Sequence, residues 1–282
     1  ITNGSSWKYD SGELFAVKTG DSKTLFSVTG TGAIQAGSAA EDSSSNNNLA
    51  IGDSDALDNI DQSSLGERNY IIGHSTGQYS LSSGQRNCFF GYAAGEDINS
   101  GFDNVLIGAY AGSTGTSMQG ATHIGYSAGG ASTGNDTVFI GRNAGLNCTG
   151  NSNVAVGKDA LDNSSAATEI TAIGHQSLSA LTGSVESNTG LGFQSGLALT
   201  SGQQCTFLGA EATTSAATLN NQTAIGFGAI TDAANQVRVG NTSVGDIDGQ
   251  VALTATSDAR VKTNVEDLSL GLDFINALRP VS

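Results

Sequence analysis

The chain has 282 residues with 39 glycines and one proline, and its 26 acidic residues against 11 basic ones give a net charge of −15. Because phosphate binding needs a basic face, this charge argues against nucleic acid and against an anionic bilayer as partners. No apolar run is long enough to span a membrane, and the three cysteines and three histidines lack zinc-ligand spacing. We therefore expect no membrane insertion, no metal and no cofactor.

Residues 1–45 are expected to form a shaft-like β segment. Two copies of the pattern L-F-x-V begin at Leu14 and Leu25, eleven residues apart. The alternation of apolar and polar residues around Phe15 and Phe26 predicts short strands. The pattern resembles the shafts of bacteriophage tail fibres, and that resemblance implies strands in intertwined chains.

Residues 46–240 contain a repeat with a period of about 17 residues. Each copy has an apolar segment followed by glycine, as in VLIG at 105–108 and VAVG at 154–157. We call these glycines the turn glycines: Gly52, Gly73, Gly91, Gly108, Gly125, Gly141, Gly157, Gly174, Gly192, Gly209, Gly226 and Gly240. A regular period of this length is typical of a solenoid, in which each copy forms one turn and stacks on its neighbours.

The columns of the repeat predict a strand and a ladder. The residue before each turn glycine is Ile, Phe, Leu or Val, and two positions earlier stands a second, often β-branched residue. The residue between them varies from Ala to His123 and Arg238. This alternation predicts a short strand with one buried face. An amide side chain lies four positions before the glycine in eight copies, which predicts an amide ladder of Asn48, Asn69, Asn87, Asn104, Asn153, Asn188, Gln222 and Gln236.

One segment of the repeat imitates a hydrolase motif. GHSTG at 73–77 fits G-x-S-x-G, with Ser75 in the place of a nucleophile and His74 beside it. GYSAG at 125–129 also fits, while the sister copies GYAAG, GAYAG and GRNAG carry other residues where the serine would be. Because one repeat column tolerates all these residues, we interpret Ser75 as a repeat residue and not as a catalytic nucleophile.

A single turn buries too few side chains to offset the ordering of its backbone, so we expect stacked turns and association of several chains. The N-x-x-φ-G pattern, as in SNVAVGKDAL at 152–161, resembles the YadA-like head repeats of trimeric autotransporter adhesins over about residues 46–240. That resemblance implies a left-handed parallel β-roll with three chains side by side. The expected fold is all-β, a β-solenoid of about twelve turns in a homotrimeric fibre.

Beyond the repeat, residues 241–256 are expected to form a β connector, and residues 257–282 change character. Apolar residues at helical spacing predict a short C-terminal helix that Pro280 closes, namely Val265, Leu268, Leu272, Ile275 and Leu278. The block S-D-x-R-x-K-x-x-V, followed by A-L-R-P, resembles the start of the intramolecular chaperone domain of endosialidase-type tail spikes and fibres. That family implies trimerisation during folding and a single self-cleavage, with Ser257 as nucleophile beside Asp258. A helix N-cap at Ser257 is the alternative.

Other acidic and aromatic residues could have either a structural or a functional role. A solvated loop or a cation site would use Asp53, Asp55, Asp58 and Asp61. A polysaccharide-cleaving enzyme would need a pair of carboxylates, for which the stacked turns offer Glu96, Asp97 and Asp103. A groove for sugars, or a simple cover over the roll, would use Tyr79, Tyr92, Tyr110 and Tyr126.

These patterns predict a fibrous recognition protein and not an enzyme. We expect a homotrimer that binds a bacterial cell-surface glycan or another surface receptor, as part of a virion tail fibre or of an extracellular fibre. Three linked copies would compensate for weak sites by raising the effective concentration. Two alternatives stay open: a polysaccharide-degrading tail spike and a passive structural shaft.

Overall fold

The computed structural model of the chain describes residues 13–18, 24–29, 34–36, 49–52, 68–77 and 83–250. Near the N-terminus, an antiparallel sheet in the order β1-β2-β3 consists of β1 (Glu13–Lys18), β2 (Thr24–Thr29) and β3 (Ile34–Ala36). Phe26 at the centre of β2 pairs with Val17 on one side and with Ala36 on the other. The strands expected at the two L-F-x-V copies are thus present, paired with each other within one chain.

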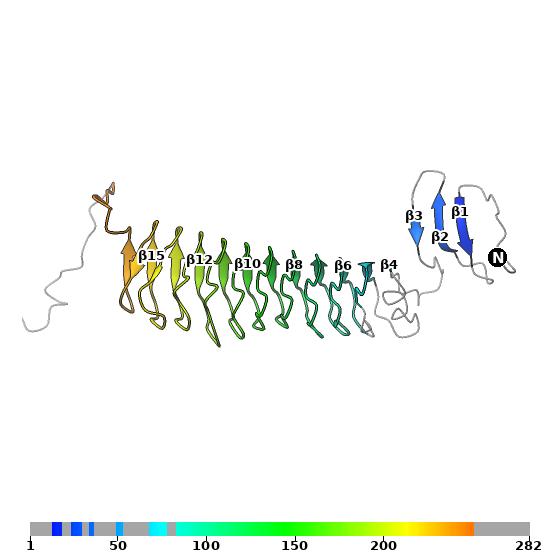
Figure 1. The fold of residues 1–282 in the computed structure, drawn as a ribbon, viewed down its shortest axis with the longest axis horizontal. Helices are drawn as coiled ribbons and strands as arrows, with labels where there is room; N and C mark the ends of the chain where they lie inside the picture. Colours follow the sequence, from blue (N-terminus) through cyan, green and yellow to red (C-terminus); the bar gives the residue numbers. More distant parts are fainter. Residues whose placement is uncertain are drawn as a thin grey trace, which may run out of the picture. The chain divides into compact units, whose positions relative to one another are not determined.

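The repeat forms a parallel β-solenoid, in which each turn contributes one short strand to a 12-stranded sheet (Figure 1). Neighbouring strands pair in register, so that Phe139 lies between His123 and Ala155. In chain order the strands are β4 (Leu49–Gly52), β5 (Tyr70–Gly73), β6 (Cys88–Phe90), β7 (Val105–Ile107), β8 (Thr122–Ile124), β9 (Val138–Ile140), β10 (Val154–Val156), β11 (Thr171–Ile173), β12 (Thr189–Leu191), β13 (Thr206–Leu208), β15 (Thr223–Ile225) and β17 (Val237–Val239).

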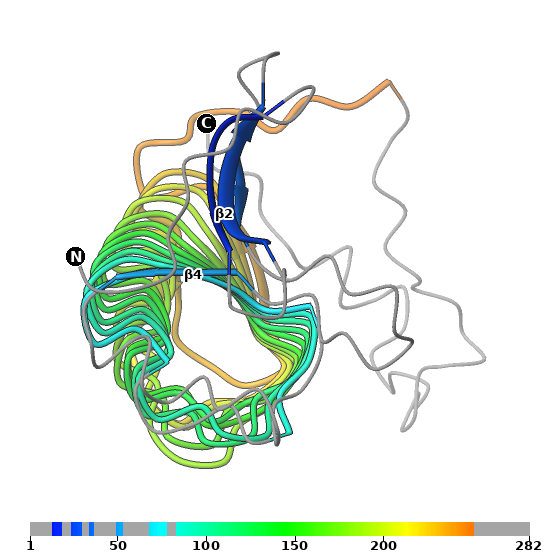
Figure 2. The same cartoon turned by 90° about the vertical axis from the view of Figure 1, so that its right-hand side faces the viewer.

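Backbone hydrogen bonds join the turns around the coil as well as within this sheet. The amide of Gly129 donates to the carbonyl of Ala144 at 2.8 Å, and that of Gly145 donates to Ala160 at 2.9 Å. Late turns add a two-stranded parallel sheet of β14 (Thr213–Thr214) and β16 (Ile230–Thr231). Viewed along their axis, the turns superimpose closely (Figure 2).

The described residues form about ten turns and contain no helix. The repeat count of twelve also includes the two copies at Gly52 and Gly73, whose turns lie partly outside the described residues. Two compact units divide the chain at residues 243 and 244. Residues 257–282, with the expected helix, also lie outside the described part.

The variable middle residue of each strand, and not the uniform apolar column, faces the interior. Phe89, Leu106, Phe139 and Phe207 are fully buried, whereas the residue directly before each turn glycine is exposed or half-buried. On the other wall of the core lies the third residue after each turn glycine, which is small and buried: Ala94, Ala111, Ala128, Ala144 and Ala160. The alternation in the sequence correctly predicted a strand, but its uniform column points outward.

The two glycines of the G-x-x-x-G segments have separate steric causes. Gly157 has a φ of +132°, and a Cβ there would lie 2.6 Å from the carbonyl oxygen of Gly174 in the next turn. Gly145 has a φ of +61°, and a Cβ there would lie 2.5 Å from Cδ2 of Phe139 in the core. The first glycine therefore allows the turns to stack, and the second leaves room for a large core side chain.

The predicted amide ladder is present in part, as a continuous interior run from Asn69 to Asn104; Asn48 lies outside the described residues, and Gln222 and Gln236 do not join the run. Nδ2 of Asn87 donates to Oδ1 of Asn69, and Nδ2 of Asn104 donates to Oδ1 of Asn87, each at 3.0 Å. The same Oδ1 atom of Asn87 also accepts the backbone amide of Asn104 at 3.1 Å. Further along the stack, Asn153 and Asn188 form separate rungs that hydrogen bond to backbone groups.

Candidate functional site

The hydrolase-like segment is built as a corner of the coil. Ser75 is buried and has a φ of +52°, and its Oγ lies 2.8 Å from Nδ1 of the adjacent His74. The equivalent positions Ala93, Tyr110 and Ser127 adopt the same left-handed backbone. The geometry of this position is thus a property of every turn, and it supports the interpretation of Ser75 as a repeat residue.

Several residues that the sequence singled out lie outside the described part of the chain. They are the proposed self-cleavage residues Ser257 and Asp258, the acidic segment with Asp53, Asp55, Asp58 and Asp61, and Tyr79. Their roles stay predictions.

The three candidate carboxylates have different surroundings. Asp103 accepts two hydrogen bonds from Arg86, at 2.6 Å from Nε and 3.0 Å from Nη2, and these hold the pKa of its carboxyl below the usual value. Partial burial, together with the neighbouring charge of Asp97, raises the pKa of Glu96. A general acid needs a raised pKa, so Glu96 suits that role better than Asp103, whose carboxylate is ion-paired with Arg86.

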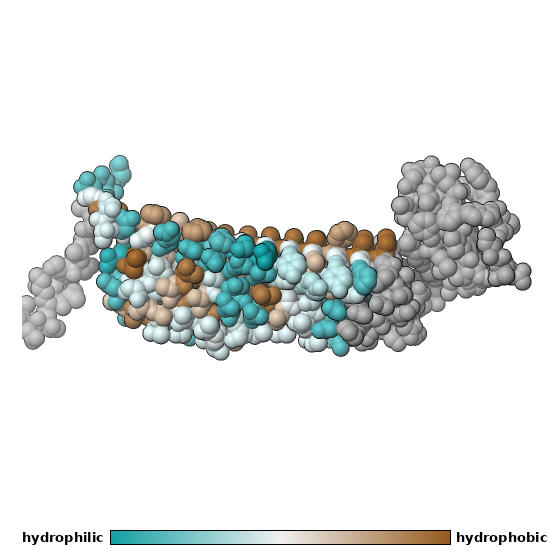
Figure 3. All heavy atoms as spheres, in the orientation of Figure 1, coloured by the Kyte–Doolittle hydropathy of each residue, from teal (hydrophilic) through white to brown (hydrophobic). Residues whose placement is uncertain are grey.

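An apolar stripe follows the strands along the outside of the solenoid. We define the outer stripe as the residues directly before the turn glycines in strands β6 to β13. Its most exposed members include Phe90, at 53% exposure, and Leu208, at 42%; the whole set is Phe90, Ile107, Ile124, Ile140, Val156, Ile173, Leu191 and Leu208. Figure 3 shows hydrophobic residues in a row along the same edge. An exposed apolar row of this kind is a candidate interaction surface.

A second row of side chains lies where the chain leaves each strand. We define the aromatic ladder as His74, Tyr92, Tyr110 and Tyr126. The ring centroids of Tyr92 and Tyr110 lie 5.1 Å apart, and those of Tyr110 and Tyr126 lie 5.9 Å apart, both in T-shaped contacts. His74 lies 5.4 Å from Tyr92 at one end, and the guanidinium of Arg142 lies 6.0 Å from the Tyr126 ring at the other.

Polar side chains continue this corner in the following turns. Asn143 donates to Asp159 at 2.9 Å, and Gln194 donates to Gln176 at the same distance, so side-chain amides bridge successive turns. Lys158 forms an ion pair with Asp159 at 2.9 Å. Beyond the aromatic ladder the corner thus carries hydrogen-bonded polar groups, together with a second pair of stacked rings, His175 and Phe193, whose centroids lie 5.5 Å apart.

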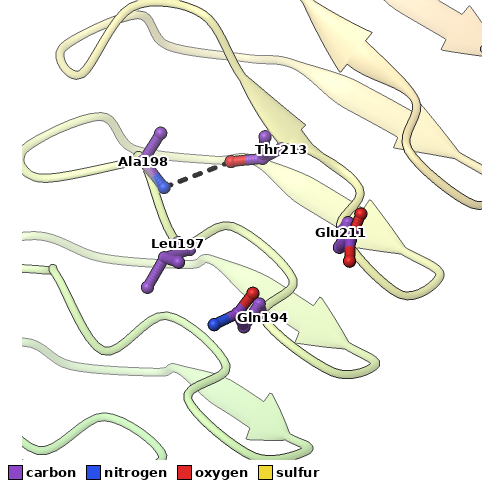
Figure 4. Close-up of a pocket in the computed structure, with 5 residues that line it drawn as sticks. All are labelled: Gln194, Leu197, Ala198, Glu211 and Thr213. Carbon is purple, nitrogen blue, oxygen red and sulfur yellow. Dashed lines mark hydrogen bonds between the residues drawn. The ribbon is translucent and has the colours of Figure 1, made fainter.

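Next to this polar section lies a shallow depression of about 190 Å³ (Figure 4). It is lined by Gln194, Leu197, Ala198, Glu211 and Thr213, and the backbone amide of Ala198 donates to the Thr213 hydroxyl at 3.2 Å. The pocket is open and smaller than a typical small-molecule site. We assign no ligand to it.

The cysteines and histidines of the described part do not gather into a metal site. Cys148 and Cys205 are buried free thiols, and burial raises the pKa of Cys148 to about 11. Within residues 68–77 and 83–250, no group of three His, Cys, Asp or Glu side chains could hold a metal ion. In the described residues, no helix is long and apolar enough to cross a bilayer.

Comparisons of the chain with models of known families, with curated proteins and with solved structures gave no match.

The sequence located the tyrosines of the aromatic ladder but not their arrangement. Tyr92 and Tyr126 directly follow a turn glycine, whereas Tyr110 lies one position later. Tyr110 has the left-handed backbone of its column, with a φ of +60°, and its ring lies between those of Tyr92 and Tyr126. Aligning the repeat copies with an offset of one position at Tyr110 would have placed the three tyrosines next to one another.

Proposed function

We propose that the chain is one subunit of a homotrimeric fibre that recognises a cell-surface glycan. The outer stripe is the observation that carries the proposal, since a single chain leaves this apolar row in water along most of the solenoid. Packing the stripes of several chains around a common axis would bury these residues. Each strand of the sheet contributes one apolar residue to the stripe, so parallel chains could align their stripes turn by turn. Three chains are the number that the resemblance to adhesin head repeats implies.

The C-terminal sequence supports the same assignment. The resemblance of residues 257–282 to the start of an intramolecular chaperone implies a fibre that must trimerise while it folds. On this proposal Ser257 is the nucleophile of one self-cleavage beside Asp258 in a longer precursor, and the mature protein is not an enzyme. Such fibres lie outside cells, on a virion tail or on a cell surface.

The surface of the solenoid is compatible with a glycan ligand. The charge of −15 per chain disfavours nucleic acid and strongly anionic polymers. Exposed tyrosines combine an apolar ring with a polar hydroxyl, a combination that suits a surface with both apolar and hydroxyl groups. Three parallel copies would turn a weak single site into firm attachment, provided that the sites can engage one surface together.

Binding of the purified protein to an array of bacterial surface polysaccharides tests this function. We expect selective, saturable binding that weakens when the subunits are separated by charged substitutions in the outer stripe. An assembled protein that binds no polysaccharide would favour the passive shaft instead. Release of reducing ends from a bound polysaccharide would favour the degrading spike.

A further inference from the structure

We infer that the aromatic ladder is a binding site for a linear, uncharged polysaccharide that lies along the solenoid axis. This inference rests on the proposed function and names the surface and the ligand class. The ladder occupies one corner of successive turns, from Gly73 to Gly125, and its ring centroids follow one another at 5.4, 5.1 and 5.9 Å, somewhat more than the strand spacing of about 4.8 Å.

The ladder is not part of the core. Tyr92, Tyr110 and Tyr126 are 47%, 37% and 52% exposed. Behind them the wall of the core is already closed by buried alanines such as Ala94 and Ala128. The rings therefore lie outside this alanine wall, and they contact one another there.

Those contacts make the ladder a prearranged surface. Each tyrosine ring packs against the edge or face of the next at 5.1 Å and 5.9 Å, which limits the rotamers that each ring can adopt. The neighbouring phenol of Tyr92 is the chief cause of a raised pKa at Tyr110. A rigid tyrosine surface offers large contact area at low cost in conformational entropy.

The chemistry around the rings suits a sugar polymer. Pyranose rings have apolar faces that pack on aromatic rings and hydroxyl edges that need hydrogen bonds. The phenol hydroxyls lie beside the rings, the carboxylate of Glu96 is close enough to act on Tyr110 electrostatically, and the guanidinium of Arg142 lies at the end of the row. A polymer of repeating units can repeat these contacts turn after turn.

The charges near the ladder favour an uncharged ligand. Glu96 and the neighbouring Asp97 put negative charge beside the middle of the row, and the chain as a whole is acidic. Arg142 is already engaged with the Tyr126 ring. A polymer with a carboxylate on each unit would meet repulsion along most of the ladder.

The test compares variants of the 282-residue chain on an array that carries linear neutral polysaccharides, such as glucans, mannans and galactans, beside acidic ones. The key variant combines Tyr92→Ala, Tyr110→Ala and Tyr126→Ala. We expect binding to a neutral polysaccharide to weaken by at least about 30-fold, while the trimer and its circular dichroism are unchanged. Replacing the same three residues by Phe keeps the rings and should weaken binding by less than about 5-fold.

Phe227→Ala is the matched control, because Phe227 is 64% exposed and directly follows a turn glycine far from the ladder. It should change affinity by less than about 3-fold.

If the protein binds a polysaccharide and the triple Ala variant binds equally well, the ladder site is wrong while the proposed function stands. Binding to acidic polymers alone overturns the ligand class. A triple variant that no longer assembles identifies the ladder as a subunit contact, and a parent protein that binds nothing on the array overturns both proposals.

Discussion

Two neighbouring turns of the solenoid fill the same space in opposite ways. In the turn of β9, the large Phe139 occupies the core and the residue four positions after the turn glycine is Gly145. In the turn of β10, the small Ala155 occupies the core and the corresponding residue is Leu161, which is fully buried. Leu161 adopts a φ of +51°, close to the +61° of Gly145, so the backbone is shared. The core thus conserves volume and not residue type.

The same rule holds in the three turns before β9, whereas the turn of β12 combines Gly190 with Gly196 and the turn of β13 combines Phe207 with Thr213. In those three turns the middle residue of the strand is large, namely Phe89, Leu106 or His123. The residue four positions after the turn glycine is then a glycine, namely Gly95, Gly112 or Gly129. Leu178 belongs to the other kind of turn and lies against Gly190 and Gly196 of the next turn. The glycine that completes the hydrolase-like motif is therefore explained by packing.

Exchanging the two kinds of turn is the strongest test of this comparison. Phe139→Ala should lower the free energy of unfolding by about 3–5 kcal/mol, because it leaves a cavity. Adding Gly145→Leu should recover about half of that loss or more, because Leu161 fills the same space one turn later. Guanidinium unfolding followed by circular dichroism measures both.

Gly145→Leu alone is the control for this exchange. It should destabilise the protein, because Phe139 already occupies the space that the new side chain needs. A double variant no more stable than Phe139→Ala would show that the two positions do not share one volume.

The interior amides are linked to one another near the N-terminal end of the solenoid and isolated further along, and substitutions there should change the free energy of unfolding by less than Phe139→Ala does. Asn87→Ala should cost about 1–3 kcal/mol of unfolding free energy, because Asn69 Oδ1 and the backbone amide of Asn104 lose a buried partner. Asn153→Ala removes a rung that has no amide neighbour and should cost less, since hydrogen bonds in a chain strengthen one another. The exposed Asn99→Ala is the control. Equal losses at Asn87 and Asn153 would show that continuity of the ladder adds nothing.

His123 should produce the smallest effect near neutral pH. Burial lowers the pKa of His123 to about 3, so below pH 6.5 the unfolded state takes up a proton that the folded state excludes until about pH 3. Stability should therefore fall with decreasing pH over this window, by at most about 1.4 kcal/mol per unit.

His123→Phe should remove that part of the slope, since Phe139 occupies the same column in the next turn. Comparing the two proteins cancels the titration of the carboxylates. Identical slopes for wild type and variant between pH 6.5 and pH 3 would mean that His123 is not the buried neutral group described above.

Part of this architecture could be predicted from the sequence, because turn glycines and amides occupy single columns. The spacing located the strands, and the column that contains Asn87 located the ladder. The pattern did not reveal which strand face is inside, since the outward column of apolar residues is more uniform than the buried column between them. The pairing of a large residue at Phe139 with a small one at Gly145 could not be seen in any single column of the repeat, because the two positions lie six residues apart.

The aromatic ladder lay beyond the pattern for a related reason. Its tyrosines occupy two different columns, yet the ring of Tyr110 contacts those of Tyr92 and Tyr126. The self-cleavage assignment to Ser257 and Asp258 still rests on the sequence alone.

The central claim is that the outer stripe is a subunit interface, and light scattering of the purified chain tests it most directly. The account predicts a particle of three times the 28.3 kDa of one chain. Combining Ile140→Asp and Leu208→Asp should lower the mass to one chain without loss of strand signal, whereas the exposed Thr133→Asp should leave the trimer intact. A wild-type protein with the mass of a single chain would contradict the account.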